Sequence, residues 1–139
     1  MIEFNFQSDF ILQEKLEFTD WITRVISSEQ KEVGQLDYIF CSDEYLLNLN
    51  QEYLNHDTYT DIITFDYSEG NHISGDIFIS TDRVKENAET FNAEFRIELL
   101  RVMCHGVLHL MGYKDKTKNE ALEMRKKEEE KIKMFHVEP

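Results

Sequence analysis

The chain is poor in cysteine and proline and has no long apolar run, and each of these absences excludes a class of protein. Two cysteines, Cys41 and Cys104, are too few for a disulfide framework, so we expect a reduced, cytoplasmic protein. The one proline is Pro139, and no low-complexity stretch marks an internal linker. No apolar run approaches the roughly 20 residues that cross a bilayer. The first residues lack a basic region followed by an apolar one, so we expect no secretory signal.

Positive charge is also scarce. Lysine and arginine number 15 against 28 acidic residues, which leaves a net charge of −13. Broad, non-specific binding of nucleic acid depends on neutralising phosphates, so this balance argues against it while leaving room for a local basic groove. The 139 residues, 41% of them hydrophobic, suit one domain over residues 1–139 with a sizeable core.

The first third of the chain predicts strand, helix, strand and helix. Apolar residues alternate over 2–7, which is typical of a half-buried strand. Helical spacing follows over about 10–28, with Trp21 at the edge of the apolar stripe and Gly34 ending the segment. The stripe comprises Leu12, Leu16, Ile22, Val25 and Ile26. We expect a strand over 36–41, then a helix capped by Ser42 or Asp43 and running to Leu54.

The remainder predicts a hairpin and three helices. Residues 62–67 and 73–80 are rich in β-forming residues and are separated by a turn signal at 68–71. Helices are expected over about 81–91, 93–111 and 117–134. A parallel β-α-β unit followed by an antiparallel addition predicts an α+β fold, with a mixed four-stranded sheet packed against helices.

The segment from Cys104 to Asp115 carries the clearest chemical signal. His105 and His109 are four residues apart, so on a helix they lie on one face, one turn apart. Gly112 can end such a helix, because glycine accepts the left-handed conformation. A chain that turns there can return Asp115 as a third ligand. Two histidines and a carboxylate, with a position left for water, are a ligand set typical of a catalytic zinc site.

The alternative is that both histidines are satisfied polar residues on a partly buried helix. Their neighbours are almost all apolar, and burying two imidazoles there without partners is costly, which favours the metal site. The spacing resembles the zinc helix of the metzincins. Those peptidases need a glutamate after the first histidine as general base, and here that position is Gly106. Peptide hydrolysis of that kind is therefore disfavoured. Cys104 diverges from His105 by about 100° and is expected to pack as an apolar group.

Two further segments have both a functional and a structural interpretation. Asp57, Thr60 and Asp61 lie in a polar stretch that either borders the metal site or only supplies turn residues. Gly75, inside a predicted strand, indicates close approach by another part of the chain.

Three stretches together carry a family resemblance. They read L-N-Q-E-Y at 49–53 with T-D-I-I-T-F at 60–65, then G-D-I-F-I-S at 75–80, then H-G-V-L-H-L-M-G-Y at 105–113. In order and spacing they resemble the bacterial YbeY family of metal-dependent endoribonucleases. The resemblance implies a zincin-like metal helix, with one zinc ion (Zn²⁺) per chain on His105, His109 and Asp115. It implies a single-strand-specific endoribonuclease in 16S rRNA maturation and ribosome quality control, with the ribosome or ribosomal proteins as partners.

The resemblance also suggests roles for residues near the metal. Asp61 would orient or deprotonate the attacking group, and Thr60 and Thr64 would contact phosphate. Two positions depart from the family pattern. Asp115 replaces the usual third histidine, and Leu54 replaces an arginine that would hold a phosphate.

The departure at Leu54 leaves several interpretations open. Lys114 or Lys116 supplies the positive charge instead, or phosphodiester cleavage is weak, or the substrate differs. A metal-dependent hydrolase of a small ester, amide or phosphate and a ribosome-associated binding module with little catalysis are the two alternative functions.

Overall fold

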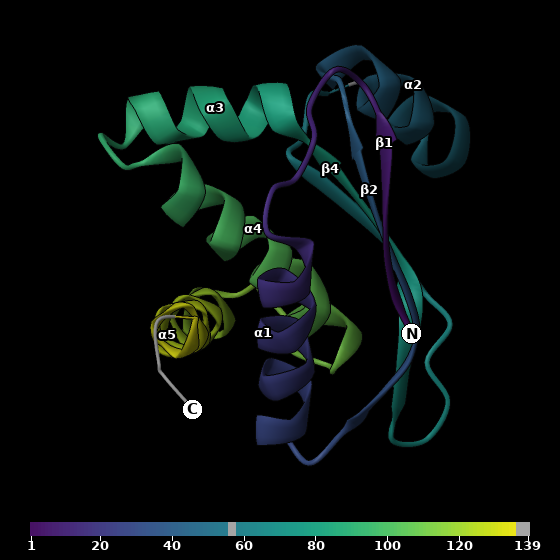
Figure 1. Cartoon of the computed structure of the whole chain (residues 1–139). Coiled ribbons are helices and arrows are strands. Elements are labelled where there is room, and N and C mark those ends of the chain that lie inside the picture. The colour runs from purple at the N-terminus through teal and green to yellow at the C-terminus, as the bar shows by residue number, and fades with distance from the viewer. Residues whose placement is uncertain (56–57, 136–139) are drawn as a thin grey trace.

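The computed structural model describes residues 1–55 and 58–135. In that part of the chain four strands and five helices form the α+β fold predicted from the sequence (Figure 1). No helix there is both long enough and apolar enough to cross a membrane. In chain order the elements are β1 (Ile2–Gln7), α1 (Lys15–Ser28), β2 (Glu32–Cys41), α2 (Asp43–Leu54), β3 (Ile62–Asp66), β4 (His72–Ser80), α3 (Thr81–Thr90), α4 (Phe95–Leu110) and α5 (Lys118–Met134).

The sheet is mixed, and its strand order is β1-β2-β4-β3. β1 and β2 pair in parallel, as the predicted β-α-β unit requires. β3 and β4 form the predicted antiparallel hairpin, and β4 also pairs with β2 in parallel. The hairpin therefore joins the sheet through its second strand, which leaves β3 at the edge.

The two faces of the sheet are covered unequally. Helices α1, α3, α4 and α5 lie on one side, while α2 lies alone on the other (Figure 1). Alternate residues of β2, among them Leu36, Tyr38 and Phe40, are fully buried in the larger core. The Tyr38 hydroxyl donates to the carbonyl of Met103 at 2.9 Å, which ties the sheet to α4. Helix α4 is therefore fixed directly against the centre of the sheet.

Local signals set several helix ends where the sequence predicted them. The Ser42 side chain caps α2 by accepting from the backbone N–H of Tyr45. Thr117 and Glu120 form a reciprocal capping box at the start of α5. Each cap satisfies backbone donors that the first turn of a helix would otherwise leave unpaired.

The prediction for the first helix was wrong at its start. α1 begins at Lys15, and Leu16, which was expected on the apolar stripe, is 86% exposed. Phe10 precedes the helix because its ring packs against Phe40 and Phe95, with centroids 5.4 and 5.9 Å apart. Trp21 is fully buried rather than at the edge, and its indole donates to the Lys131 carbonyl at 2.8 Å. Tertiary contacts between residues 30 to 110 positions apart thus override the local helical spacing.

Gly34 does not end a helix, because it lies inside β2, which starts earlier than predicted. The register between β2 and β4 shifts between Val33 and Leu36. A Cβ at Gly34 would collide with the Ser74 side chain. Gly75 likewise has no space for a side chain, because a Cβ there would collide with the carbonyl oxygen of Phe65. The predicted close approach at Gly75 is therefore confirmed.

Candidate metal centre

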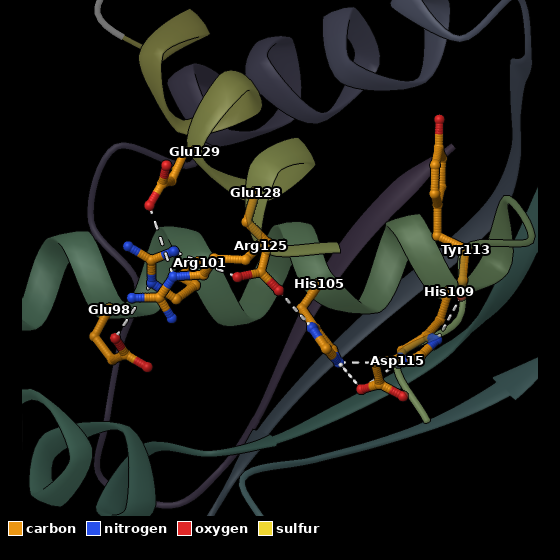
Figure 2. Close-up of polar contacts among 9 residues, drawn as sticks. All are labelled: Glu98, Arg101, His105, His109, Tyr113, Asp115, Arg125, Glu128 and Glu129. Carbon is orange, nitrogen blue, oxygen red and sulfur yellow. Dashed lines mark hydrogen bonds and ion pairs between the residues drawn. The ribbon is translucent and has the colours of Figure 1, made fainter. Parts of the chain in front are cut away.

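Helix α4 and the turn after it bring the three predicted metal ligands together (Figure 2). The Nε2 atoms of His105 and His109 lie 2.9 Å apart. The Oδ2 atom of Asp115 lies 3.3 Å from the first and 3.4 Å from the second. Tetrahedral zinc, with bonds of about 2.0–2.1 Å, places its ligand atoms about 3.3 Å apart. The triangle of donor atoms therefore fits such an ion.

The return of Asp115 depends on how α4 ends. Gly112 has a φ of +102°. Its N–H donates to the His109 carbonyl, and the next N–H, from Tyr113, donates to the Leu108 carbonyl, both at 3.0 Å. This pair of bonds is a Schellman motif, which a glycine in the left-handed region completes. The expectation that Gly112 ends the helix is confirmed, and the reversal turns the chain back toward the histidines.

Each histidine has a hydrogen-bond partner on its other ring nitrogen. His109 Nδ1 lies 2.9 Å from the Tyr113 carbonyl, which can only accept, so the Nδ1–H donates. His105 Nδ1 lies 2.6 Å from Oε2 of Glu128, on α5. Metal-binding histidines commonly donate their second N–H in this way, which leaves Nε2 free to bind. Both rings are therefore oriented for coordination through Nε2.

The charges around His105 favour its protonated form. Burial lowers the pKa of the imidazole, but the hydrogen bond to Glu128 and the negative charges of Glu128 and Asp115 outweigh burial. The pKa is consequently raised above its ordinary value. A bound cation would replace the proton and meet the same negative surroundings.

The three ligand atoms open onto a groove of about 800 Å³. Its walls come from residues 58–61, strand β3, helices α2 and α4, and the loop after α4. The ligand side chains keep 21, 29 and 39% of their surface exposed for His105, His109 and Asp115, respectively. This partial exposure leaves access for a further ligand or a substrate, as a catalytic site requires.

Both predicted catalytic residues line this groove, as does Thr64. Burial raises the pKa of the Asp61 carboxyl, and the nearby His105 imidazole lowers it by less. The hydroxyl of Thr60 donates to the carbonyl of Ile62 at 3.3 Å. Asp57, which the sequence placed beside them, lies outside the described residues.

The structure separates the two lysines that could supply positive charge. Lys116 lines the groove together with the three ligands and Leu54. Lys114 instead lines a separate hollow beside Glu120 and Glu123. Among residues 1–55 and 58–135, Lys116 is the only lysine or arginine in the groove wall.

Gly106 allows helix α4 to pack closely against the sheet. A Cβ there would come within 2.9 Å of side-chain atoms of both Ile62 and Ile77. The residue after the first histidine therefore faces the sheet, and a glutamate would have no room. Cys104 is fully buried beside it, and burial raises the pKa of its thiol well above the ordinary range. The expectation that Cys104 packs as an apolar group is confirmed.

Sequence reasoning missed Glu128 and its partners. Glu128 follows two lysines in a strongly charged helix and has two further glutamates after it, so its composition marks it as solvated. It is nevertheless buried, as are Met124 and Lys131 on the same helix. The spacing of 124, 128 and 131 places all three on one helical face. That spacing is the signal that could have identified Glu128.

Fold and site together define a class: an α+β protein with an open site of two histidines one helical turn apart and a carboxylate from the loop after the helix, the arrangement of a metal-dependent hydrolase. The family model described as "Endoribonuclease YbeY" matches residues 3–136. The chain belongs to this family, and the resemblance noted in its motifs is confirmed.

Individual relatives agree over nearly the whole chain. A protein of Flavobacterium johnsoniae named "Endoribonuclease YbeY" is 59% identical over 138 residues, covering 99% of each chain. The protein of that name from Bacteroides fragilis is 51% identical over 122 residues, covering 81% of this chain and 88% of its own. The solution structure of TM1509 from Thermotoga maritima is similar, with a TM-score of 0.70 and 27% identity, covering 97% of this chain and 89% of that one.

Proposed function

We propose that the chain is a zinc-dependent endoribonuclease that cuts single-stranded RNA, acting in the cytoplasm in 16S rRNA maturation and ribosome quality control. The observation that carries the proposal is the triangle formed by His105, His109 and Asp115 at the floor of an open groove. Family membership over residues 3–136 supports the substrate class. On this proposal, ribosomal RNA is the substrate and the ribosome or its proteins are the partners.

The metal would supply the first part of the proposed chemistry. Zinc held by the three ligands would act as a Lewis acid toward the phosphate and lower the pKa of a water molecule. Its charge would also offset part of the repulsion between RNA and a protein of net charge −13. The RNA contact is therefore small and centred on the metal.

Asp61 is the proposed general base. It lines the groove and is partly buried, and its raised pKa gives it a greater affinity for a proton than an exposed aspartate has. A carboxylate of this kind can orient or deprotonate the group that attacks phosphorus. Thr60 and Thr64 line the same wall and would contact the phosphate.

Lys116 is the proposed phosphate anchor. Leu54 lines the same groove and cannot bind an anion. Arg101, on the helix that bears the histidines, is already held between Glu98 at 3.6 Å and Glu128 at 3.3 Å. Lys116 follows the candidate ligand Asp115 in the chain and lines the same groove, and on this proposal its ammonium would bind the scissile phosphate.

The direct test is cleavage of a single-stranded RNA by the zinc-loaded protein, with a duplex of the same sequence as comparison. We expect cleavage of the single strand that a chelator abolishes. Asp115→Ala should lose zinc and cleavage together, whereas Asp61→Asn should keep zinc and lose at least about 10²-fold in rate. Asp9→Ala, an exposed aspartate before α1, is the matched control. Unchanged cleavage by Asp115→Ala would contradict the three-ligand site.

A hydrolase acting on small phosphate esters is a second candidate. Leu54, Tyr59 and Ile62 give the groove an apolar wall that suits a compact substrate. Turnover of a simple phosphodiester, with RNA cut no faster, would favour this function over the first.

A further inference from the structure

Glu128 has an environment that ordinary packing does not explain. Its side chain is 6% exposed, and its two oxygens point to different groups. Oε1 lies 3.3 Å from a guanidinium nitrogen of Arg101, and Oε2 lies 2.6 Å from Nδ1 of His105 (Figure 2). The carboxylate thus reaches from α5 to a metal ligand 23 residues earlier in the chain.

Burying a carboxylate costs free energy unless it is paired and hydrogen-bonded. Arg101 provides the pairing, and it is itself held by Glu98 at 3.6 Å on the preceding turn. The arginine alone would occupy only one of the two carboxylate oxygens. The second oxygen is aimed at the imidazole, so the arrangement serves the histidine as well as the ion pair.

We infer that Glu128 is a positioning residue that holds His105 with its proton on Nδ1 and its Nε2 lone pair toward the metal. The Nδ1–H of His105 donates to Oε2 of Glu128 at 2.6 Å, while the other carboxylate oxygen contacts Arg101 at 3.3 Å. The bond also increases the electron density that Nε2 offers to a cation. This inference rests on the proposed metal site.

The two histidines donate to different kinds of acceptor, so the role of Glu128 predicts that they differ as ligands. His109 donates to a neutral carbonyl, that of Tyr113, whereas His105 donates to a carboxylate. Charge-assisted hydrogen bonds are shorter and about twice as strong as neutral ones, in keeping with 2.6 Å against 2.9 Å. His105 should therefore be the stronger ligand. Of the two histidines, only His105 should be affected when the Glu128 charge is removed.

The experiment measures the zinc dissociation constant by competition with a chromophoric chelator. The proteins are the full-length wild type, Glu128→Gln, and the control Glu129→Gln. Glu129 is one residue away on the same helix, is 59% exposed, and pairs only loosely with Arg125 at 3.7 Å. We expect Glu128→Gln to bind zinc about 10–100-fold more weakly. The control should bind like the wild type.

Proton NMR of the zinc-loaded proteins supplies a readout that a merely structural role would not move. The Nδ1 proton of His105 should resonate far downfield in the wild type and in Glu129→Gln, and should shift upfield or vanish in Glu128→Gln. The His109 signal should stay in place. Because the wild-type spectrum tests the hydrogen bond by itself, the inference can be judged even if Glu128→Gln fails to fold.

The outcomes separate this inference from the function on which it rests. Equal zinc affinity in wild type and Glu128→Gln, or a wild-type His105 signal without a downfield shift, would overturn the role of Glu128 and leave the metal site standing. A wild type that binds no zinc would overturn the metal site, and this inference with it.

Discussion

At the residue scale, the site depends on Gly112 as much as on its three ligands. Gly112 adopts a φ of +102°, which side-chain-bearing residues rarely adopt, and the turn that it makes returns Asp115 to the histidines. A residue outside the candidate ligand set therefore determines whether Asp115 can reach the two histidines.

Gly112→Ala should weaken zinc binding as well as the fold. The strained backbone should cost about 1–2 kcal/mol of unfolding free energy, measured by urea denaturation, and the displaced Asp115 should raise the zinc dissociation constant. Gly70→Ala is the matched control, because Gly70 has a φ of +58° in the turn between β3 and β4, away from the site. Equal zinc affinity in both variants would contradict the role given to Gly112.

The second residue-scale prediction concerns Lys116. Lys116→Gln should raise KM for RNA, because a charge-assisted contact to phosphate is lost, while zinc affinity stays unchanged. Lys114→Gln is the control, since that lysine lines a different hollow. Leu54→Arg, placed in the same groove, should recover part of the loss. If both lysine variants behave like wild type, the phosphate is held elsewhere.

At the scale of elements, a partly buried cluster around Glu29 joins three segments. The Glu29 carboxylate follows the last turn of α1 and accepts from Lys131 at 2.8 Å and Lys127 at 3.0 Å, both on α5. Its other oxygen accepts from the Tyr113 hydroxyl at 2.6 Å. The Tyr113 carbonyl in turn orients His109, so the cluster anchors the loop that carries Asp115.

This cluster predicts a pH dependence of stability. Burial would raise the pKa of Glu29, but the bonds from the lysines and the tyrosine outweigh it and lower the pKa from 4.5 to about 2. The folded state therefore binds this proton less tightly than the unfolded state. The resulting stability is complete above about pH 5 and is lost as the pH falls toward 2.

Glu29→Gln should lower the free energy of unfolding by on the order of 3 kcal/mol at pH 7, at about 1.4 kcal/mol per pKa unit. The substitution should also reduce the fall in the free energy of unfolding between pH 5 and pH 2. Urea denaturation across that range is the measurement, with the exposed Glu3→Gln as control. Identical pH profiles for wild type and Glu29→Gln would show that the cluster does not stabilise the fold.

Elements with strong local signals could be predicted from the sequence. Helix α4 was expected over 93–111 and runs from Phe95 to Leu110. The motif of α4 also located all three candidate ligands, because a helix and one glycine turn determine their relative positions. The start of α1, the place of Gly34 and the partners of Glu29 and Glu128 could not be predicted. Each depends on contacts between residues far apart in sequence, such as Phe10 with Phe95.

At the scale of the whole molecule, an acidic protein can act on RNA, its proposed substrate, if the contact is confined to one groove. A surface of net charge −13 repels RNA at long range, so contact has to come from a few groups in one groove. The metal ligands, Lys116 and Asp61 all line that groove, which lies between the edge strand β3 and helix α4. The fold therefore gathers the groups proposed to bind RNA in one place.

The most direct test of the metal site is the zinc content of the purified protein by elemental analysis, with wild type beside His109→Ala. We expect about one zinc ion per wild-type chain and its loss in the variant, because two remaining ligands hold zinc poorly. The absence of metal from both proteins, even after zinc is added at neutral pH, would contradict the three-ligand site. His105 and His109 would then be packing residues on α4.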